Sequence, residues 1–157
     1  MLVGITGKAR AGKDTIADYL VAKYGFIKIG FADSLKLYTV QLFGLDPEYL
    51  YQESLKDHRT PILWRDLEYP KRFVPTDPMF VTFRELLIMT GQVLRGLYSR
   101  IWIDGVFETI AVEMKGKRVV IKDVRFDNEG ATILNNSGIV FRVVRPNQTY
   151  AIDDVTE

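Results

Sequence analysis

The sequence predicts an α/β protein in which a mostly parallel sheet is flanked by helices. Short apolar runs alternate along the chain with segments of helical periodicity. The first apolar run is joined to the first helical segment by a glycine-rich loop, an arrangement typical of strand–loop–helix units. The chain has 157 residues, so we expect one domain, large enough for a sheet that is covered on both faces.

Strands and helices are expected in alternating order. The predicted strands are apolar runs at residues 2–6, 26–31, 118–122 and 139–144. Helical periodicity runs through residues 16–24, about 33–43, 82–94, about 102–114 and about 128–135, and a short helical stretch opens at residues 46–48. Strands that alternate with helices usually pair in parallel, and this order therefore predicts one mostly parallel sheet.

The middle of the chain is the irregular part. Residues 58–78 contain four of the six prolines and show no sustained periodicity, so we expect an excursion from the core over about residues 45–80. Directly after it, Thr82 and Glu85 have the spacing of a capping box, which predicts that a helix starts there.

A GxxxxGK pattern follows the first predicted strand, and it predicts a phosphate-binding P-loop. Its two glycines permit a backbone geometry that places successive N–H groups around phosphate oxygens, and its lysine adds a positive charge. The next helix contributes its positive N-terminal end. The alternative is a tight turn that binds no ligand. The expected nucleotide-binding residues are Gly7, Lys8, Ala9, Arg10, Ala11, Gly12, Lys13, Asp14 and Thr15.

Two aspartates are candidates for holding Mg²⁺. Asp14 stands where the usual pattern has Ser or Thr, and the hydroxyl comes one residue later at Thr15. Asp14 fits a metal ligand and, equally well, a helix-start acid stabilised by the helix dipole. Asp123 ends the strand expected beside the first strand and is the second candidate. Carboxyl ends of parallel strands form one rim, so we expect Asp33, Asp123 and the loop to share it.

The composition excludes several classes of protein. The chain has no cysteine, which excludes disulfides, thiolate nucleophiles and cysteine-based metal sites and fits a reducing compartment. Its net charge of +1 gives no general electrostatic footprint for nucleic acid. No signal peptide and no apolar run long enough to span a bilayer is visible. We therefore expect a cytoplasmic protein with neither a nucleic-acid nor a membrane partner.

Five short blocks resemble, in order and spacing, the motifs of phage-type deoxynucleoside monophosphate kinases. The blocks are residues 12–15, 31–36, 84–92, 102–104 and 123–129. The resemblance implies a three-layer, adenylate-kinase-like P-loop kinase fold, with ATP and Mg²⁺ as cofactors and a deoxynucleoside monophosphate as acceptor of the γ-phosphoryl group. It also implies that residues 45–80 lie on the substrate side. If the chain is encoded by a phage, the protein would be located in the cytoplasm of the host. Whether the chain forms a homodimer stays open.

Phosphoryl transfer requires cations that neutralise the equatorial oxygens of the transferred phosphoryl group. The protein itself contributes little covalent chemistry. Lys13 is the first catalytic candidate, because a lysine that closes a P-loop contacts the transferred phosphate. Arg125 is the second, since it follows a buried strand and its guanidinium can span two phosphates. The alternative for Arg125 is a surface arginine paired with Asp127 or Glu129.

The acceptor side would draw on residues between the second and third predicted strands. Arg84 and Arg95 are eleven residues apart, which places them on one helix face about 16 Å apart. We expect one to meet a phosphate and the other a carboxylate or a base edge. Residues 56–65 are either a mobile cover or a loop anchored by Trp64. The candidates for acceptor binding are Asp33, Lys36, Arg65, Arg84, Gln92, Arg95 and Trp102.

Two of these candidates have alternative interpretations, and so does the function. Gln92 either reads a base through its amide or lies on a helix surface, and Trp102 either stacks on a base or packs in the core. The function itself has two alternatives. One is another small-molecule kinase, of the dephospho-coenzyme A or phosphomevalonate type. The other is a regulatory module that binds ATP without transferring phosphate.

Overall fold

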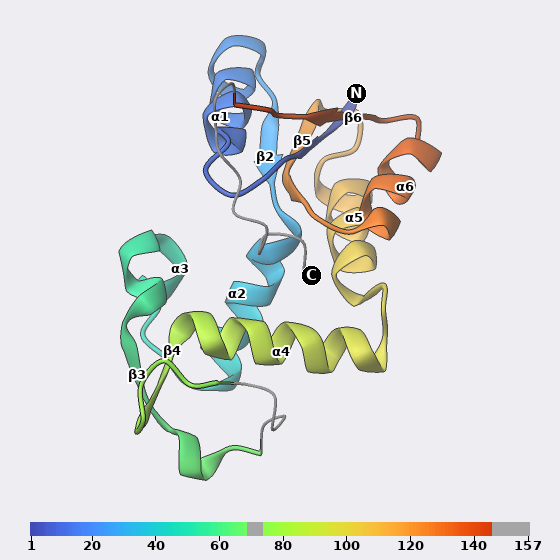
Figure 1. Cartoon of the computed structure of the whole chain (residues 1–157). Coiled ribbons are helices and arrows are strands. Elements are labelled where there is room, and N and C mark those ends of the chain that lie inside the picture. The colour runs from blue at the N-terminus through green and yellow to red at the C-terminus, as the bar shows by residue number, and fades with distance from the viewer. Residues whose placement is uncertain (69–73, 146–157) are drawn as a thin grey trace. The chain divides into compact units, whose positions relative to one another are not determined.

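The computed structural model describes residues 1–68 and 74–145, and its contacts form two compact units (Figure 1). Unit 1 comprises Met1–Phe31 and Ile103–Glu157, and unit 2 comprises Ala32–Trp102. The predicted α/β class is confirmed, with a mostly parallel sheet flanked by helices. Within the described residues, no helix is long and apolar enough to cross a membrane. The single domain predicted for residues 1–157 stays a prediction.

The sheet of unit 1 has four strands that all pair in parallel. They are β1 (Leu2–Thr6), β2 (Ile27–Ile29), β5 (Val119–Val124) and β6 (Ile139–Arg142), in the spatial order β2-β5-β1-β6. The four predicted strands are therefore confirmed, although β2 is shorter than predicted because helix α2 already starts at Phe31. β1 is central, and its Val3 and Ile5 are buried, as expected for a strand covered on both faces.

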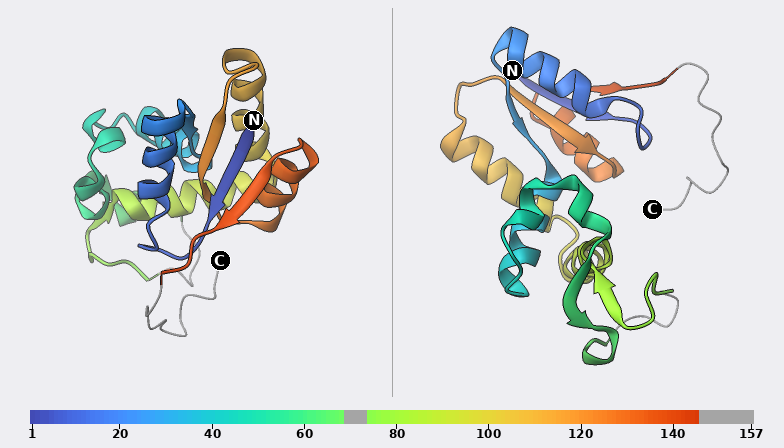
Figure 2. Two further views of the ribbon diagram at one scale, coloured as in Figure 1. Left: turned by 90° about the horizontal axis from the view of Figure 1, so that it is seen from above. Right: turned by 90° about the vertical axis from the view of Figure 1, so that its left-hand side faces the viewer.

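Helices cover both faces of this sheet. Helix α1 (Lys13–Tyr24) lies on one face, and α5 (Ile101–Glu113) and α6 (Asp127–Asn135) lie on the other (Figures 1 and 2). The helical periodicity predicted over about residues 102–114 is confirmed by α5, whose Val106 is buried. The helix predicted over residues 16–24 is present as part of α1, but two of its periodic apolar residues do not face the core, because Ile16 and Tyr24 are 40% and 46% exposed. Only the small Ala17 is buried there, in a cluster with Val3, Ile5, Phe26 and Val120.

Unit 2 has its own apolar core. Its elements are α2 (Phe31–Leu42), α3 (Glu48–Tyr51), β3 (Arg59–Leu63), β4 (Phe80–Thr82) and α4 (Phe83–Leu97), with two short 3-10 turns, η1 (Glu53–Asp57) and η2 (Trp64–Asp66). Val40, Leu45, Trp64, Val81, Phe83 and Leu86 form the buried cluster. The capping box is confirmed, because the N–H and hydroxyl of Thr82 both donate to Glu85 Oε2, at 2.7 and 2.8 Å.

The two strands of unit 2 are absent from the sequence prediction. β3 and β4 pair antiparallel, with Arg59 opposite Thr82 and Leu63 opposite Phe80, and the hydroxyl of Thr60 donates to the Val81 carbonyl at 2.7 Å. Trp64, directly after β3, is buried. The segment 56–65 therefore contains a paired strand where a mobile cover or a loop was expected, and the buried Trp64 is the anchor that the second expectation named.

Candidate active site

The 7–15 loop joins β1 to α1 through backbone conformations that favour glycine. Gly12, the N-cap of α1, has φ 101°, and Gly7 has φ 145°. A Cβ atom added at Gly7 would lie 2.6 Å from the Val143 carbonyl oxygen, so both the conformation and the neighbouring chain exclude a larger residue there. Arg10 is also left-handed, at φ 60°. The loop is thus wound tightly over the carboxyl end of β1.

Lys13 folds back over this loop. Its Nζ donates to the carbonyl oxygens of Gly7 at 2.7 Å and Lys8 at 2.8 Å. Burial lowers the pKa of Lys13 and the positive charge of Arg125 lowers it further, while Asp14 and Asp123 raise it, so the pKa lies below its ordinary value. Lys13, Arg125, Asp14 and Asp123 all belong to unit 1.

Asp123 is held at the end of β5. Its Oδ1 accepts a hydrogen bond from the Phe31 N–H at 2.8 Å, at the first residue of α2. A Cβ atom at Gly30 would lie 2.9 Å from that same oxygen, so a glycine leaves the room that the carboxylate needs. Asp123 and the loop share the carboxyl edge of the sheet as expected, because Thr6 of β1 is in register with Val124 of β5. Asp33 lies in unit 2.

The described residues hold no group of three or more His, Cys, Asp or Glu that could bind a metal ion. Asp14 is exposed in the first turn of α1, and Asp123 is half-buried. Mg²⁺ is commonly held by one or two carboxylates together with substrate phosphates and water. The residues present therefore fit Mg²⁺ that arrives with a nucleotide, and no closed metal site is formed by these side chains alone.

Arg125 opens the short connection from β5 to α6. Its side chain is exposed, and its backbone N–H donates to Glu129 Oε2 at 2.8 Å. The Phe126 N–H donates to the same oxygen at 3.1 Å. The alternative for Arg125 named Asp127 or Glu129 as a partner of its guanidinium, whereas these contacts join Glu129 to the backbone. The backbone contacts of Glu129 could have been predicted from its position in the sequence. It lies three residues after Phe126, the N-cap of α6, and a glutamate at that position commonly caps a helix.

The predicted acceptor-side residues all lie in unit 2. Asp33 and Lys36 are half-buried on α2, and on α4 Gln92 is exposed and Arg95 half-buried. Arg65 is exposed in the η2 turn, with its Nε 3.7 Å from Asp66 Oδ1. Trp102 is only 3% exposed and packs at 6.4 Å, ring centre to ring centre, from Tyr38. That packing matches the core alternative for Trp102.

Arg84 meets a carboxylate, as expected for one of the two arginines on this helix. Its Nε and Nη2 donate to the two oxygens of Asp57, at 2.5 and 3.0 Å, in a two-pronged ion pair. The hydrogen bond from Arg84 holds the pKa of Asp57 below its ordinary value. The partner is 27 residues away in the sequence, so no local pattern predicts the pair.

A pocket of about 350 Å³ surrounds this pair in unit 2. It is lined by Asp57, Arg59, Thr76, Asp77, Thr82, Arg84 and Glu85. Nη2 of Arg59 lies 2.5 Å from Oδ2 of Asp77, whose pKa is lowered by hydrogen bonds from the Phe80 and Met79 N–H groups. The pocket thus contains two arginines, each paired with an aspartate.

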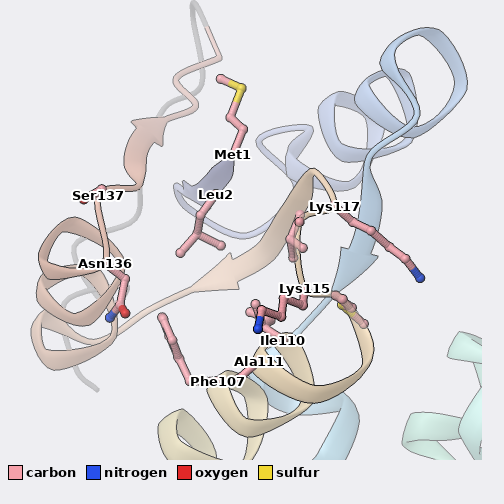
Figure 3. A pocket seen from close by; sticks show the side chains of 12 residues that line it. Met1, Leu2, Phe107, Ile110, Ala111, Lys115, Lys117, Asn136 and Ser137 are labelled. Atoms are coloured by element: carbon pink, nitrogen blue, oxygen red, sulfur yellow. The ribbon is translucent and has the colours of Figure 1, made fainter.

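A second hollow, of about 390 Å³, lies at the other end of the unit 1 sheet (Figure 3). Leu2 and Val119, which open β1 and β5, line it together with Phe107 and Ile110 of α5. These are the amino ends of parallel strands, whereas the 7–15 loop and Arg125 follow the carboxyl ends. The hollow is therefore separate from the candidate site.

Comparison with known proteins agrees with this geometry. No model of a protein family matches the chain. The chain is 30% identical, over 151 residues, to a protein of Acanthamoeba polyphaga mimivirus described as "Putative deoxynucleotide monophosphate kinase". The match covers 93% of this chain and 75% of the viral protein. Fold and relative together define a nucleotide kinase, which is a phosphotransferase. The chain belongs to the deoxynucleotide monophosphate kinase family.

Proposed function

We propose that the chain transfers the γ-phosphoryl group of ATP to the 5′-phosphate of a deoxynucleoside monophosphate, giving a deoxynucleoside diphosphate and ADP. The bond between the γ-phosphorus and the β–γ bridging oxygen breaks, and an acceptor phosphate oxygen forms the new bond. The observation that carries the proposal is the ammonium group of Lys13, folded into the 7–15 loop within electrostatic reach of Arg125. Such a transfer depends on positioning and charge neutralisation.

We assign Lys13 and Arg125 to the transferring group. The N–H groups of residues 7–15 and the N-terminus of α1 would bind the nucleotide phosphates, and Lys13 would exchange its carbonyl partners for phosphate oxygens. Arg125 would place its planar guanidinium against donor and acceptor oxygens. Asp14 and Asp123 would hold Mg²⁺ or its water ligands, and the ion would supply charge neutralisation at the phosphates.

We assign acceptor binding to unit 2, with residues 1–157 acting as one catalytic domain and residues 45–80 on the acceptor side. The assigned residues are Asp33, Lys36, Arg65, Arg84, Gln92, Arg95 and Trp102. For Arg84 the assignment has a specific consequence. Because Asp57 holds its guanidinium through both oxygens, an acceptor phosphate would have to replace a carboxylate of similar geometry.

A panel of acceptors tests the function. The protein is incubated with ATP, Mg²⁺ and each of dAMP, dCMP, dGMP and dTMP, and nucleotides are separated by ion-exchange chromatography. We expect equal amounts of ADP and deoxynucleoside diphosphate with at least one acceptor, and almost none with Lys13→Ala. Transfer to dephospho-coenzyme A or phosphomevalonate instead would reassign the acceptor. ATP binding with no transfer to any of these would contradict the proposal.

A further inference from the structure

Glu129 is a buried carboxylate that the transfer mechanism above does not use. It is only 2% exposed, and burying a carboxylate is costly unless it accepts hydrogen bonds. Its Oε2 accepts two of them, from the N–H groups of Arg125 and Phe126. Glu129 thus binds the backbone of the segment that carries Arg125, the second predicted catalytic residue.

The connection that Glu129 binds is very short. β5 ends at Val124 and α6 begins at Asp127, so residues 125 and 126 are the whole connection. One carboxylate oxygen therefore binds both N–H groups of that connection. The Phe126 carbonyl in turn accepts the N–H groups of Glu129 and Gly130, at 3.1 and 3.2 Å. The N–H of Arg125 and both the N–H and the carbonyl of Phe126 are therefore bonded, which restrains the backbone from which the Arg125 side chain extends.

We propose that Glu129 is a positioning residue for Arg125. By binding the N–H groups at residues 125 and 126, it fixes the backbone from which the guanidinium extends, at the carboxyl edge of the sheet that also carries the 7–15 loop. The inference rests on the proposed function, in which Arg125 stabilises the transferring phosphoryl group. A catalytic group that is displaced by about 1 Å can lose about a hundredfold in rate, so the position of this backbone matters for turnover.

A capping role alone would give a different result from a positioning role. Glu85 supplies the matched case, because it is also buried at the first turn of a helix and accepts hydrogen bonds from Thr82 and Thr76. None of these bonds goes to the backbone of an arginine. Glu85→Gln therefore perturbs a buried helix-start carboxylate without changing the connection that carries Arg125.

The experiment is a double-mutant cycle on the full chain. Glu129→Ala, Arg125→Ala and the double variant are compared with wild type by steady-state kinetics, with ATP and the acceptor both varied. We expect Glu129→Ala to lower kcat by about tenfold to a hundredfold with little change in either KM. In the Arg125→Ala background the same substitution should change kcat by less than about twofold, since Glu129 then has nothing to position.

Two further variants control for folding. Glu129→Gln keeps the shape and one acceptor oxygen, so it should recover part of the lost kcat. It replaces the alanine variant in the cycle if Glu129→Ala does not fold. Glu85→Gln serves as the folding control, because its thermal midpoint measures the cost of altering a buried helix-start carboxylate, with which that of Glu129→Gln is compared.

The outcomes separate this inference from the function beneath it. A wild-type protein that forms no deoxynucleoside diphosphate contradicts the proposed function itself. An active wild type with folded Glu129 variants of normal kcat overturns the positioning role. The positioning role is also overturned if Glu129→Ala lowers kcat by the same factor in the wild-type and in the Arg125→Ala background, because a purely structural effect does not depend on Arg125.

Discussion

Two strand-to-helix junctions of this molecule contain similar residues and use them differently. In unit 1, β5 is followed by Arg125 and, in the first turn of α6, by the buried Glu129. In unit 2, β4 runs directly into α4, whose first turn contains both Arg84 and the buried Glu85. Each junction thus places an exposed arginine beside a buried glutamate.

The difference lies in what the carboxylate binds. Glu129 binds the N–H of the arginine itself, whereas Glu85 binds Thr82 and Thr76. The guanidinium of Arg84 is paired with Asp57, far away in the sequence. A glutamate at the third position of a helix therefore predicts where the helix starts. The contacts of the folded chain decide that Arg125 has its backbone bound and that Arg84 has its side chain paired.

The largest expected effect tests whether the unit 1 junction belongs to a phosphate site at all. Lys13→Ala removes the ammonium held within the 7–15 loop and should lower kcat by about a hundredfold to a thousandfold, the scale for one preorganised electrostatic donor. Turnover is measured with saturating ATP and acceptor. Lys23→Ala, an exposed lysine at the other end of α1, should leave kcat unchanged. Near-normal turnover of Lys13→Ala would exclude the loop from the chemistry.

The second effect sets the two arginines against each other. Arg125→Lys should depress kcat by roughly tenfold or more and leave the acceptor KM little changed, because lysine keeps the charge and loses the planar fork. Arg84→Lys should mainly raise the acceptor KM and leave the KM for ATP alone. Both variants are measured with both substrates varied. The comparison breaks if the pattern is reversed, or if both variants behave like wild type.

A smaller effect concerns the metal on the unit 1 side. If Asp14 helps to hold Mg²⁺, Asp14→Asn should raise the Mg²⁺ concentration for half-maximal activity, and Asp14→Ser should partly restore it by recreating the usual ligand. Asp18→Asn on the same helix is the control. An unchanged Mg²⁺ dependence of both Asp14 variants would make Asp14 a helix-start residue and Asp123 the stronger metal candidate.

The smallest effect is a pH dependence on the unit 2 side. Burial raises the pKa of Glu85, but hydrogen bonds from Thr76 and Thr82 outweigh it, so the folded-state pKa lies below the ordinary value. The unfolded chain then binds more protons, so this stabilisation is present above the unfolded pKa, about 4.3, and is lost as the pH falls through the folded pKa.

Thermal unfolding at pH values between 7 and 3 measures that dependence. Glu85→Gln should have a lower thermal midpoint than wild type at pH 7, and the two curves should converge in acid. Glu48→Gln, exposed on α3 of the same unit, should run parallel to wild type. A constant difference between Glu85→Gln and wild type at every pH would show that the carboxylate charge makes no contribution.

Local patterns predicted most of the fold. The four strands of unit 1 are apolar runs, and the start of α4 follows from the spacing of Thr82 and Glu85, because both signals depend on residues close in sequence. β3 and β4 escaped prediction for the opposite reason. β3 contains Pro61 and does not alternate regularly, β4 has three residues, and their pairing joins segments about twenty residues apart.

The candidate site was predictable to a similar limit. The glycines and Lys13 of the 7–15 loop form a contiguous pattern, so their grouping was visible in the sequence. The bond from Phe31 to Asp123 joins residues 92 apart, and the pairing of Arg84 with Asp57 is also non-local. Such contacts depend on the tertiary fold. The spacing of residues in the sequence shows that these residues are present, but it does not predict which of them meet.

The division of the chain also bears on how the protein folds as it is synthesised. Unit 2 is one continuous segment, Ala32–Trp102, whereas unit 1 is assembled from both sides of it. β1 finds its partners only when β5 and β6 exist, since Leu2 pairs with Val119 and Val3 with Ile139. Contacts that close such long loops form late and slowly. On the ribosome we therefore expect unit 2 to complete its contacts first and the sheet that bears the 7–15 loop to close last.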